Sequence, residues 1–242
     1  MADCIIYPIP LVQLKHDKSM MTYRLNIGQP LYCANYAWYI EGPKEKILVD
    51  TGGASELFAE RGQLDKVIQT LDTGLSKLGV SFNDIDLVIL THLHHDHVAH
   101  ARRFPKARFI VQKDELEFAQ NPHPAVATPF YKEFFDGLNF EVISGDTRIS
   151  EEISVISTPG HTPGGQSVCI KTAQGIVVIA GLCTIQENFE PPSPLNETMP
   201  VIAPAFHINV LEAYDSLLRI KAVADIVIAP HDSRFQQINS IP

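Results

Sequence analysis

The strongest constraint on this chain is the sequence THLHHDH at residues 91–97, in which four of seven residues are histidine and one is aspartate. The stretch follows the apolar run DLVIL at 86–90, which predicts a buried strand. Imidazole nitrogens and carboxylate oxygens are the usual protein ligands of zinc and similar divalent metals. In an extended or looping backbone the first two histidines point the same way, and Asp96 and His97 face a second point nearby. The stretch therefore predicts a site for one metal or a close pair, rather than a solvated polar loop.

Length, charge and hydropathy restrict the kind of partner. The chain has 242 residues, which is enough to bury a substantial core. Its net charge of -9, without a cluster of Lys and Arg, argues against nucleic acid or an anionic membrane. We find neither a membrane-spanning apolar run nor the N-terminal pattern of a signal peptide. We expect one domain over residues 1–242, in the cytoplasm, that acts on a small molecule, with a homodimer left open.

Hydrophobic periodicity predicts strands and helices in two similar halves. Prolines in the strand at 4–12 suggest that it lies at a sheet edge. Apolar residues at helical spacing predict a helix from Leu64 to Leu78, ended by Gly79. The aromatic segment 130–138 is either a packed helix or a pocket wall. Further strands are predicted at 31–40, 47–49, 86–91, 108–111, 140–143, 153–156, 166–171, 176–180 and 225–229, helices at 98–103, 114–120 and 210–223, and a proline-rich loop at 190–204.

Three more polar residues follow predicted strands. Asp50 ends the strand LVD, His161 lies in the turn TPGHTPGG at 158–165, and His231 follows the last strand. Active sites are commonly built from such residues, on loops that a rigid scaffold brings together. We therefore expect His161 and His231 to join the histidine cluster as metal ligands.

The sequence resembles the metallo-β-lactamase-fold hydrolases, and within them it is most similar to the N-acyl-homoserine lactonase group. The resemblance rests on motifs that occur in the family's order over most of the chain. These are LVDTG at 48–52, HLHHDH at 92–97, TPGHTPG at 158–164, ENF at 187–189 and HD at 231–232. It implies an α/β (α+β) fold, an αββα sandwich of two mixed β-sheets flanked by helices.

The resemblance also implies a ligand set. Asp50 would hydrogen-bond the site and orient a ligand rather than bind metal. The metal would be Zn²⁺, one or two per chain, with Mn²⁺, Fe²⁺ or Co²⁺ as alternatives. One metal would be held by His92, His94 and His161, and the other by Asp96, His97 and His231.

One part of the family pattern is missing. The family usually carries an aspartate that bridges both metals after the strand at 176–180, where this chain has Gly181-Leu182-Cys183. The tyrosine common just beyond it in the lactonases corresponds to Thr184. Two accounts follow for Cys183. Either it supplies a thiolate to the second metal, or it is a buried thiol like Cys4, Cys33 and Cys169, and the site binds one metal firmly or two weakly.

The donor types predict hydrolysis assisted by a metal. A divalent ion lowers the pKa of bound water to about 7 and polarises a carbonyl group. Asp96 is the expected catalytic residue, because it could orient the water or carry a proton to the leaving group. A neighbouring cation would keep its carboxylate ionised.

The resemblance to the lactonases implies a small lactone, or a related cyclic ester or amide, as the substrate. The alternatives are a thioesterase of the glyoxalase II type, a mononuclear iron oxidoreductase of the same fold, and a metal-binding protein without hydrolase activity. His95 would face away from the ligands in an extended loop, where it lines the pocket or is solvated. Candidate substrate contacts, with core packing or solvent exposure as the alternative for each, are His95, Thr184, Phe189, Phe206 and His207.

Overall fold

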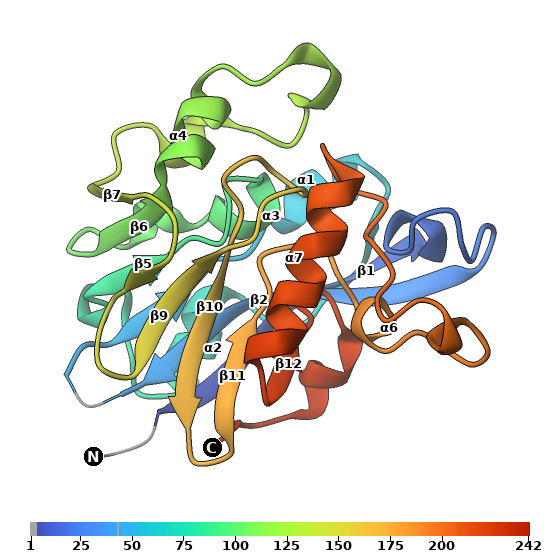
Figure 1. The fold of residues 1–242 in the computed structure, drawn as a ribbon. Coiled ribbons are helices and arrows are strands. Elements are labelled where there is room, and N and C mark those ends of the chain that lie inside the picture. Colours follow the sequence, from blue (N-terminus) through green and yellow to red (C-terminus); the bar gives the residue numbers. More distant parts are fainter. Residues whose placement is uncertain (1–3, 43) are drawn as a thin grey trace.

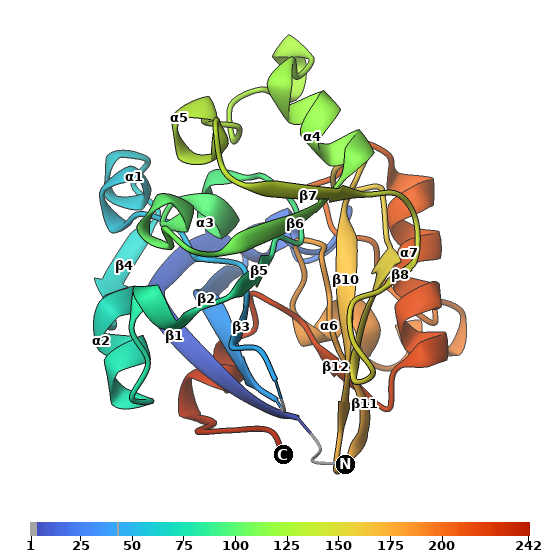
Figure 2. The same cartoon turned by 90° about the vertical axis from the view of Figure 1, so that its left-hand side faces the viewer.

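The computed structural model describes residues 4–42 and 44–242. Two β-sheets lie face to face, and helices cover the outer face of each, as Figures 1 and 2 show from two directions. Both sheets contain parallel and antiparallel pairs of strands. The predicted αββα sandwich of two mixed sheets is therefore confirmed.

The first sheet has seven strands. They are β1 (Ile5–Asp17), β2 (Pro30–Glu41), β3 (Ile47–Val49), β4 (Leu64–Val67), β5 (Leu87–Ile89), β6 (Arg108–Gln112) and β7 (Phe140–Ile143). Their order in space is β4-β1-β2-β3-β5-β6-β7, with β3, β5, β6 and β7 parallel to one another.

The second sheet has five strands. They are β8 (Thr147–Arg148), β9 (Ile153–Ser157), β10 (Gln166–Thr172), β11 (Gly175–Ile179) and β12 (Ile226–Ile228), in the order β12-β11-β10-β9-β8. The α-helices are α1 (Ser55–Glu60), α2 (Leu71–Lys77), α3 (His95–Val98), α4 (Lys113–Gln120), α5 (Lys132–Phe135), α6 (Gln186–Phe189) and α7 (Val210–Val223). Short 3-10 turns lie at Lys18–Met20, Phe82–Asp84, Ala101–Arg103, Pro124–Val126, Leu195–Glu197 and Ser233–Gln237.

Alternation along the strands builds the layers. Leu87 and Ile89 of β5 lie in the cluster between the two sheets, whereas Val88 packs on the outer face with Leu71 and Leu75 of α2. Successive side chains of a strand point to opposite faces, so a strand buried on both faces is apolar throughout. Each fully buried aliphatic side chain contributes about 1.5–3 kcal/mol. Helix α7 covers the outer face of the second sheet in the same way.

The predicted helix from Leu64 to Leu78 is wrong in its first half. Residues 64–67 form β4, which pairs with β1 through Leu14 and Val12, and α2 begins only at Leu71 after the Thr70 cap. The three-residue spacing of Leu64 and Val67 is also typical of one face of a helix. Here the segment is a strand, and its backbone pairs with the edge of β1 that would otherwise be unpaired. Helix α1 was not predicted.

The predicted edge position of the first strand also needs correction, because β4 lies outside β1. Pairing with β4 starts only at Val12, beyond Pro8 and Pro10. On the other side of these prolines, Ile6 forms a bridge with Ile241. The prolines, which lack an N–H group, therefore occupy a part of β1 that pairs with β2 on one side and with no strand on the other.

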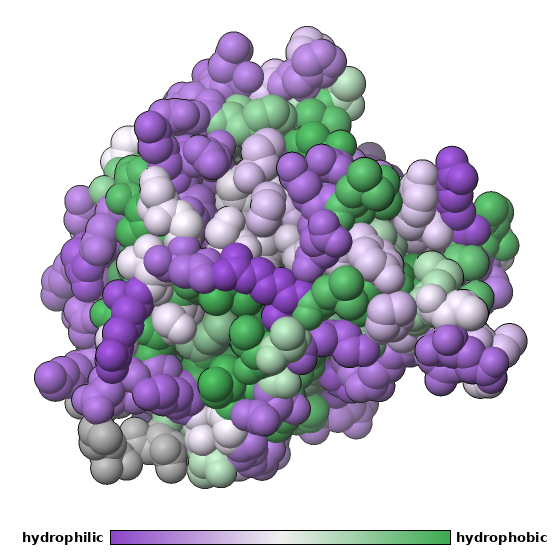
Figure 3. All heavy atoms as spheres, viewed as in Figure 1, coloured by the Kyte–Doolittle hydropathy of each residue, from purple (hydrophilic) through white to green (hydrophobic). Residues whose placement is uncertain are grey.

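The face shown in Figure 3 is dominated by hydrophilic residues, with apolar residues in separate patches. One patch lies over the upper end of α7. Large apolar side chains exposed near the start of this helix are Phe206, Ile208 and Leu211. No helix within residues 4–42 and 44–242 is long and apolar enough to cross a lipid bilayer.

Candidate metal centre

The candidate ligands come from loops that follow strands of both sheets. Asp50 follows β3, residues 91–97 follow β5, His161 follows β9 and His231 follows β12. Backbone hydrogen bonds hold these loops in place, since Thr51 donates to the carbonyl of His97, and Gln166 at the start of β10 donates to the carbonyl of Thr91. The two sheets thus bring together, at one edge, polar residues that are far apart in the sequence.

Three histidines surround one point. The ligating nitrogens of His92, His94 and His161 all lie within 4.8 Å of one another. Their rings meet at 84–86°, with centroids 4.6–4.7 Å apart. All three side chains are buried. Three imidazoles that converge at right angles provide a donor set suited to one tetrahedral metal with an open position.

A second group lies beside the first. Donor atoms of His92, Asp96 and His97 fall within 4.8 Å of one another, and the Asp96 carboxylate lies 3.8 Å from Nε2 of His231. Nε2 of His97 and Nε2 of His231 are buried and make no hydrogen bond among the described residues, and both face the Asp96 carboxylate, at 3.3 and 3.8 Å. Leaving buried polar atoms unpaired is costly. The arrangement therefore fits a metal ion, which would satisfy both nitrogens.

The other ring nitrogen of several histidines is fixed by the protein. Asp50 Oδ2 accepts a hydrogen bond from His97 Nδ1 at 2.7 Å, and Phe206 O accepts one from His161 Nδ1 at 2.7 Å. Ala34 O accepts a longer one from His231 Nδ1 at 3.3 Å. A proton held on Nδ1 leaves the Nε2 lone pair free for a metal.

Asp50 does more than hold one ring. Its carboxylate also accepts hydrogen bonds from the backbone N–H and the hydroxyl of Thr91, both at 2.8 Å. Its φ angle is 56°, in the left-handed region that residues other than glycine rarely adopt. These contacts compensate the strained backbone and fix the start of the histidine stretch.

Glu115 of α4 supports the site, although the sequence did not single it out. Its fully buried carboxylate accepts hydrogen bonds from the N–H of Leu93 at 2.8 Å and of Gly164 at 3.2 Å. It thereby joins the loop of His92 and His94 to the loop of His161. Gly164 is required, because a Cβ there would lie 2.0 Å from the Glu115 backbone nitrogen. In the sequence, the acidic residues of α4 look like those of a solvated helix, so nothing there distinguishes Glu115 from its neighbours.

Asn35 of β2 is a second residue that sequence reasoning missed. Its side chain donates to the carbonyl of Asp96 at 2.7 Å and accepts from the N–H of Gly53 at 2.7 Å. The approach is close, since a Cβ on Gly53 would lie 2.9 Å from the Asp96 Cα. A polar residue at the buried centre of an aromatic-rich strand was the available signal.

The comparisons with known proteins agree with this geometry. Residues 32–231 match the metallo-beta-lactamase superfamily. The chain belongs to this superfamily. An N-acyl homoserine lactonase of Bacillus cereus is 29% identical over 204 residues, which cover 78% of this chain and 80% of the relative. A probable metallo-hydrolase of Methanocaldococcus jannaschii is 33% identical over 159 residues, which cover 66% of this chain and 63% of the relative.

Solved structures give the same family. A quorum-quenching N-acyl homoserine lactone hydrolase has a TM-score of 0.81 and 28% identity, with 98% of this chain and 96% of that chain covered. A lactone hydrolase with the product N-hexanoyl-L-homoserine at its catalytic metal center has a TM-score of 0.80 and 26% identity, over the same shares. The predicted resemblance is confirmed.

In this superfamily member, burial tunes most of the histidines for metal binding. It lowers the pKa of His92 and His94 well below the usual value, and it lowers the pKa of His161 and His231 to about 4. A histidine must be neutral to bind a metal. These four side chains therefore carry no proton at neutral pH that a metal would have to displace.

His97 behaves differently. Burial lowers its pKa, but the carboxylates of Asp96 and Asp50 outweigh burial and raise the pKa to about 10. Asp96 in turn has a pKa well below its usual value, because the nearby histidines outweigh its own burial. A metal that uses His97 must therefore displace a proton from its ring.

The missing bridging carboxylate corresponds to a packing feature. A Cβ on Gly181 would lie 1.9 Å from the carbonyl oxygen of Gln166, so any side chain there would shift the backbone. Cys183 lines the same cavity as Asp96, but it belongs to neither group of close donors within the described residues. Its Sγ contacts Met21 Sδ at 3.4 Å, and burial raises its pKa well above the usual value.

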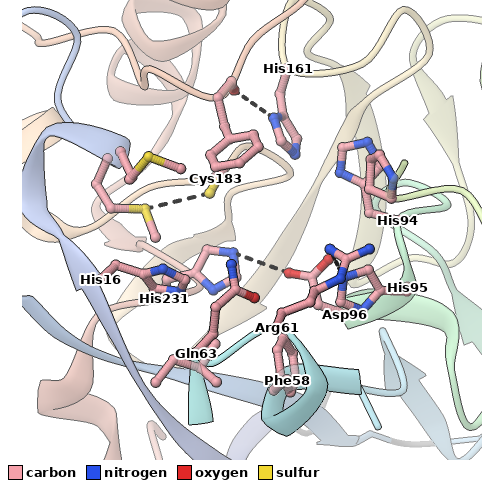
Figure 4. Close-up of a pocket in the computed structure, with 15 residues that line it drawn as sticks. His16, Phe58, Arg61, Gln63, His94, His95, Asp96, His161, Cys183 and His231 are labelled. Carbon is pink, nitrogen blue, oxygen red and sulfur yellow. Dashed lines mark hydrogen bonds and ion pairs between the residues drawn. The ribbon is translucent and has the colours of Figure 1, made fainter. Parts of the chain in front are cut away.

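The remaining candidates lie in different places. His95 begins helix α3 rather than an extended loop, and it lines the cavity at the metal centre (Figure 4). Phe206 lines this cavity and an adjoining groove, and His207 lines the groove. Thr184 is fully buried and its hydroxyl donates to Leu182 O, while Phe189 packs in the core beneath α7. Neither contributes to the cavity walls.

Glu115→Gln tests the joint between the two ligand loops. The amide places an NH₂ donor against an N–H donor, so we expect a loss of about 1–3 kcal/mol in the free energy of unfolding. We also expect metal affinity to fall by about 10–100-fold. Denaturant unfolding of the metal-free protein and competition with a chelator measure the two effects. Glu117→Gln, on the exposed face of the same helix, is the matched control, and equal behaviour of both variants contradicts the role.

Metal release on acidification should occur in two steps. Protons compete with metal for imidazole nitrogen, and competition begins at a higher pH when the pKa of the metal-free histidine is higher. His97, with a pKa of about 10, is in competition throughout the neutral range, whereas His161, with a pKa of about 4, is not. Metal at the His97 group should leave near neutrality, and metal at the His161 group only below roughly pH 5. The measurement is elemental analysis of the protein after dialysis at a series of pH values from 8 downwards. Loss of all metal in a single step would contradict the prediction.

Proposed function

We propose that this protein is a metal-dependent hydrolase that opens a small lactone. The observation that carries the proposal is the convergence of His92, His94 and His161 next to a cavity that His94, His161 and Asp96 line. A divalent metal held there would supply an activated water and polarise the carbonyl group of the substrate. The superfamily membership and the lactonase relatives support the same chemistry.

Asp96 is the residue we assign to proton handling. Its side chain is one-fifth exposed and lines the cavity, while its backbone carbonyl is held by Asn35. Oδ2 lies 3.3 Å from His97 Nε2. His97 and the other nearby histidines lower the pKa of Asp96 and so keep its carboxylate ionised. An ionised carboxylate at this place can orient a water and then transfer its proton to the leaving group.

The adjoining groove suits an apolar arm of the substrate. It opens beside His94 and His161, and its lining is mainly apolar, including Val126, Pro129 and Ile208. A solved relative holds N-hexanoyl-L-homoserine at its metal center, a molecule with an acyl chain next to the opened ring. We propose that an acyl group of the substrate occupies this groove.

We propose Zn²⁺ as the metal, because nitrogen donors with one carboxylate suit it, and Mn²⁺, Fe²⁺ and Co²⁺ are the other outcomes of elemental analysis. One ion would be held firmly by His92, His94 and His161. A second would be held weakly at Asp96, His97 and His231, because the bridging carboxylate is absent and His97 carries a proton. We keep a cytoplasmic location and a homodimer as proposals.

The test is a substrate panel with zinc-loaded protein. We expect acid release from N-acyl homoserine lactones and simpler lactones, and a loss of about 10²–10⁴-fold in rate for Asp96→Asn. Asp114→Asn, on the exposed face of α4, is the control. Thiol release from an acyl-glutathione without lactone hydrolysis would support a thioesterase instead, and oxygen uptake with bound iron an oxidoreductase. Metal binding without turnover of any class would leave a metal-binding protein.

A further inference from the structure

We propose that Arg61 makes one wall of the cavity a subsite for a carboxylate, so that the preferred lactone carries a negatively charged arm. This inference rests on the proposed lactone-opening function and names its substrate class. Arg61 follows α1 and lines the cavity with Gln63, His95 and Asp96. Figure 4 shows Arg61, Gln63 and His95 on the side of the cavity opposite His161.

The charge of Arg61 is not neutralised by the protein. No carboxylate lies within 4.0 Å of its guanidinium in residues 4–42 and 44–242. The side chain is only partly exposed, and a partly buried charge without a counterion is unfavourable. Among the described residues, Asp96 is the single acidic residue of the cavity wall, and the histidines lie beside its carboxylate. An anion from outside would therefore meet an unpaired cation.

The contacts of Arg61 within the protein are all to neutral groups. Nη1 donates to His95 Nε2 at 3.0 Å, and Nη2 donates to Thr128 O and the Tyr131 hydroxyl, each at 3.1 Å. These three bonds hold the guanidinium in place and use three of its five N–H groups. The Nε–H and one Nη1–H have no acceptor in the described part of the chain, so both are available to a ligand.

His95 positions the Arg61 guanidinium. Because arginine can only donate, the His95 Nε2 facing it must accept, which places the proton of the neutral ring on Nδ1. That Nδ1 is buried away from the cavity and has no hydrogen-bond partner within the described residues. His95 therefore supplies an acceptor to Arg61, and the free N–H groups of the guanidinium are left as the donors of this wall.

The two openings beside the metal centre thus differ in character. In the described part of the chain, no Asp, Glu, Lys or Arg lines the groove with Val126, Pro129 and Ile208, whereas the Arg61 wall is cationic. The chain as a whole has a net charge of -9, so this cation is local to the cavity. An acyl arm that ends in a carboxylate would therefore lie along the Arg61 wall, whereas an uncharged acyl arm would take the apolar groove, with the lactone ring at the metal centre in both cases. Electrostatic complementarity of this kind selects substrates more than it tightens binding in general.

The first experiment compares matched substrates. We would measure kcat/KM of zinc-loaded protein for N-succinyl-homoserine lactone and for the uncharged N-pentanoyl analogue of similar length. We expect the wild type to prefer the charged lactone, and Arg61→Gln to lose roughly tenfold or more of that preference, as for a charge-assisted hydrogen bond. Arg61→Lys should keep part of it. Tyr131→Phe removes one of the three bonds that hold the guanidinium but keeps its charge, so it should retain most of the preference. An equal loss in Arg61→Gln and Tyr131→Phe would mean that Arg61 only braces the wall.

A second measurement separates this inference from the proposed function. Binding of glutarate and of butyrate to the zinc-loaded protein is compared by calorimetry, since both bring one carboxylate to the metal but only glutarate brings a second. We expect tighter binding of glutarate, and loss of the difference in Arg61→Gln. If no lactone is hydrolysed but this difference holds, the lactonase proposal fails and the carboxylate subsite stands. If lactones are hydrolysed without preference for the charged arm, and glutarate binds no better than butyrate, the subsite is wrong.

Discussion

The hydrogen bonds of Asp50 are the interaction on which the metal centre depends most. One carboxylate joins the end of β3 to Thr91 after β5 and to the ring of His97. It fixes the first residue of the histidine stretch and the direction of its last ring at once. The strained backbone at Asp50 persists because three hydrogen bonds require that conformation. The sandwich supplies the parallel strand ends, and this aspartate converts them into a defined set of donors.

The supporting residues show why the fold needs both sheets for its chemistry. Glu115 joins the loop after β5 to the loop after β9, and Asn35 of β2 holds the backbone of Asp96. Glycines at 53 and 164 let these backbones approach closer than any side chain would allow. A side chain at Gly181 would require the backbone to shift, and no carboxylate stands at residues 181–183, so the second donor group depends on the protonated His97. The two donor groups therefore differ, because one contains only histidines with lowered pKa and the other contains the protonated His97.

Most strands and much of the donor set were predictable from local patterns in the sequence, and the two-sheet sandwich was predicted from the resemblance to the family. Apolar runs that end in polar residues gave the strands, and HLHHDH, His161 and His231 gave the candidate ligands. The failures were long-range. Residues 64–67 form a strand only because the edge of β1 needs a partner, and Glu115 reads as a surface residue until its helix packs against both loops. The ring of Phe189 packs in the hydrophobic core and does not line the cavity.

The most direct test is the metal content per chain of protein purified without added metal, by elemental analysis, for the wild type and His161→Ala. The account predicts at least one divalent ion per wild-type chain, because the nitrogens of His92, His94 and His161 converge on one point. It predicts loss of that ion in the variant, which lacks one of the three donors. Full metal content in His161→Ala, or none in the folded wild type at neutral pH, would contradict the metal centre described here.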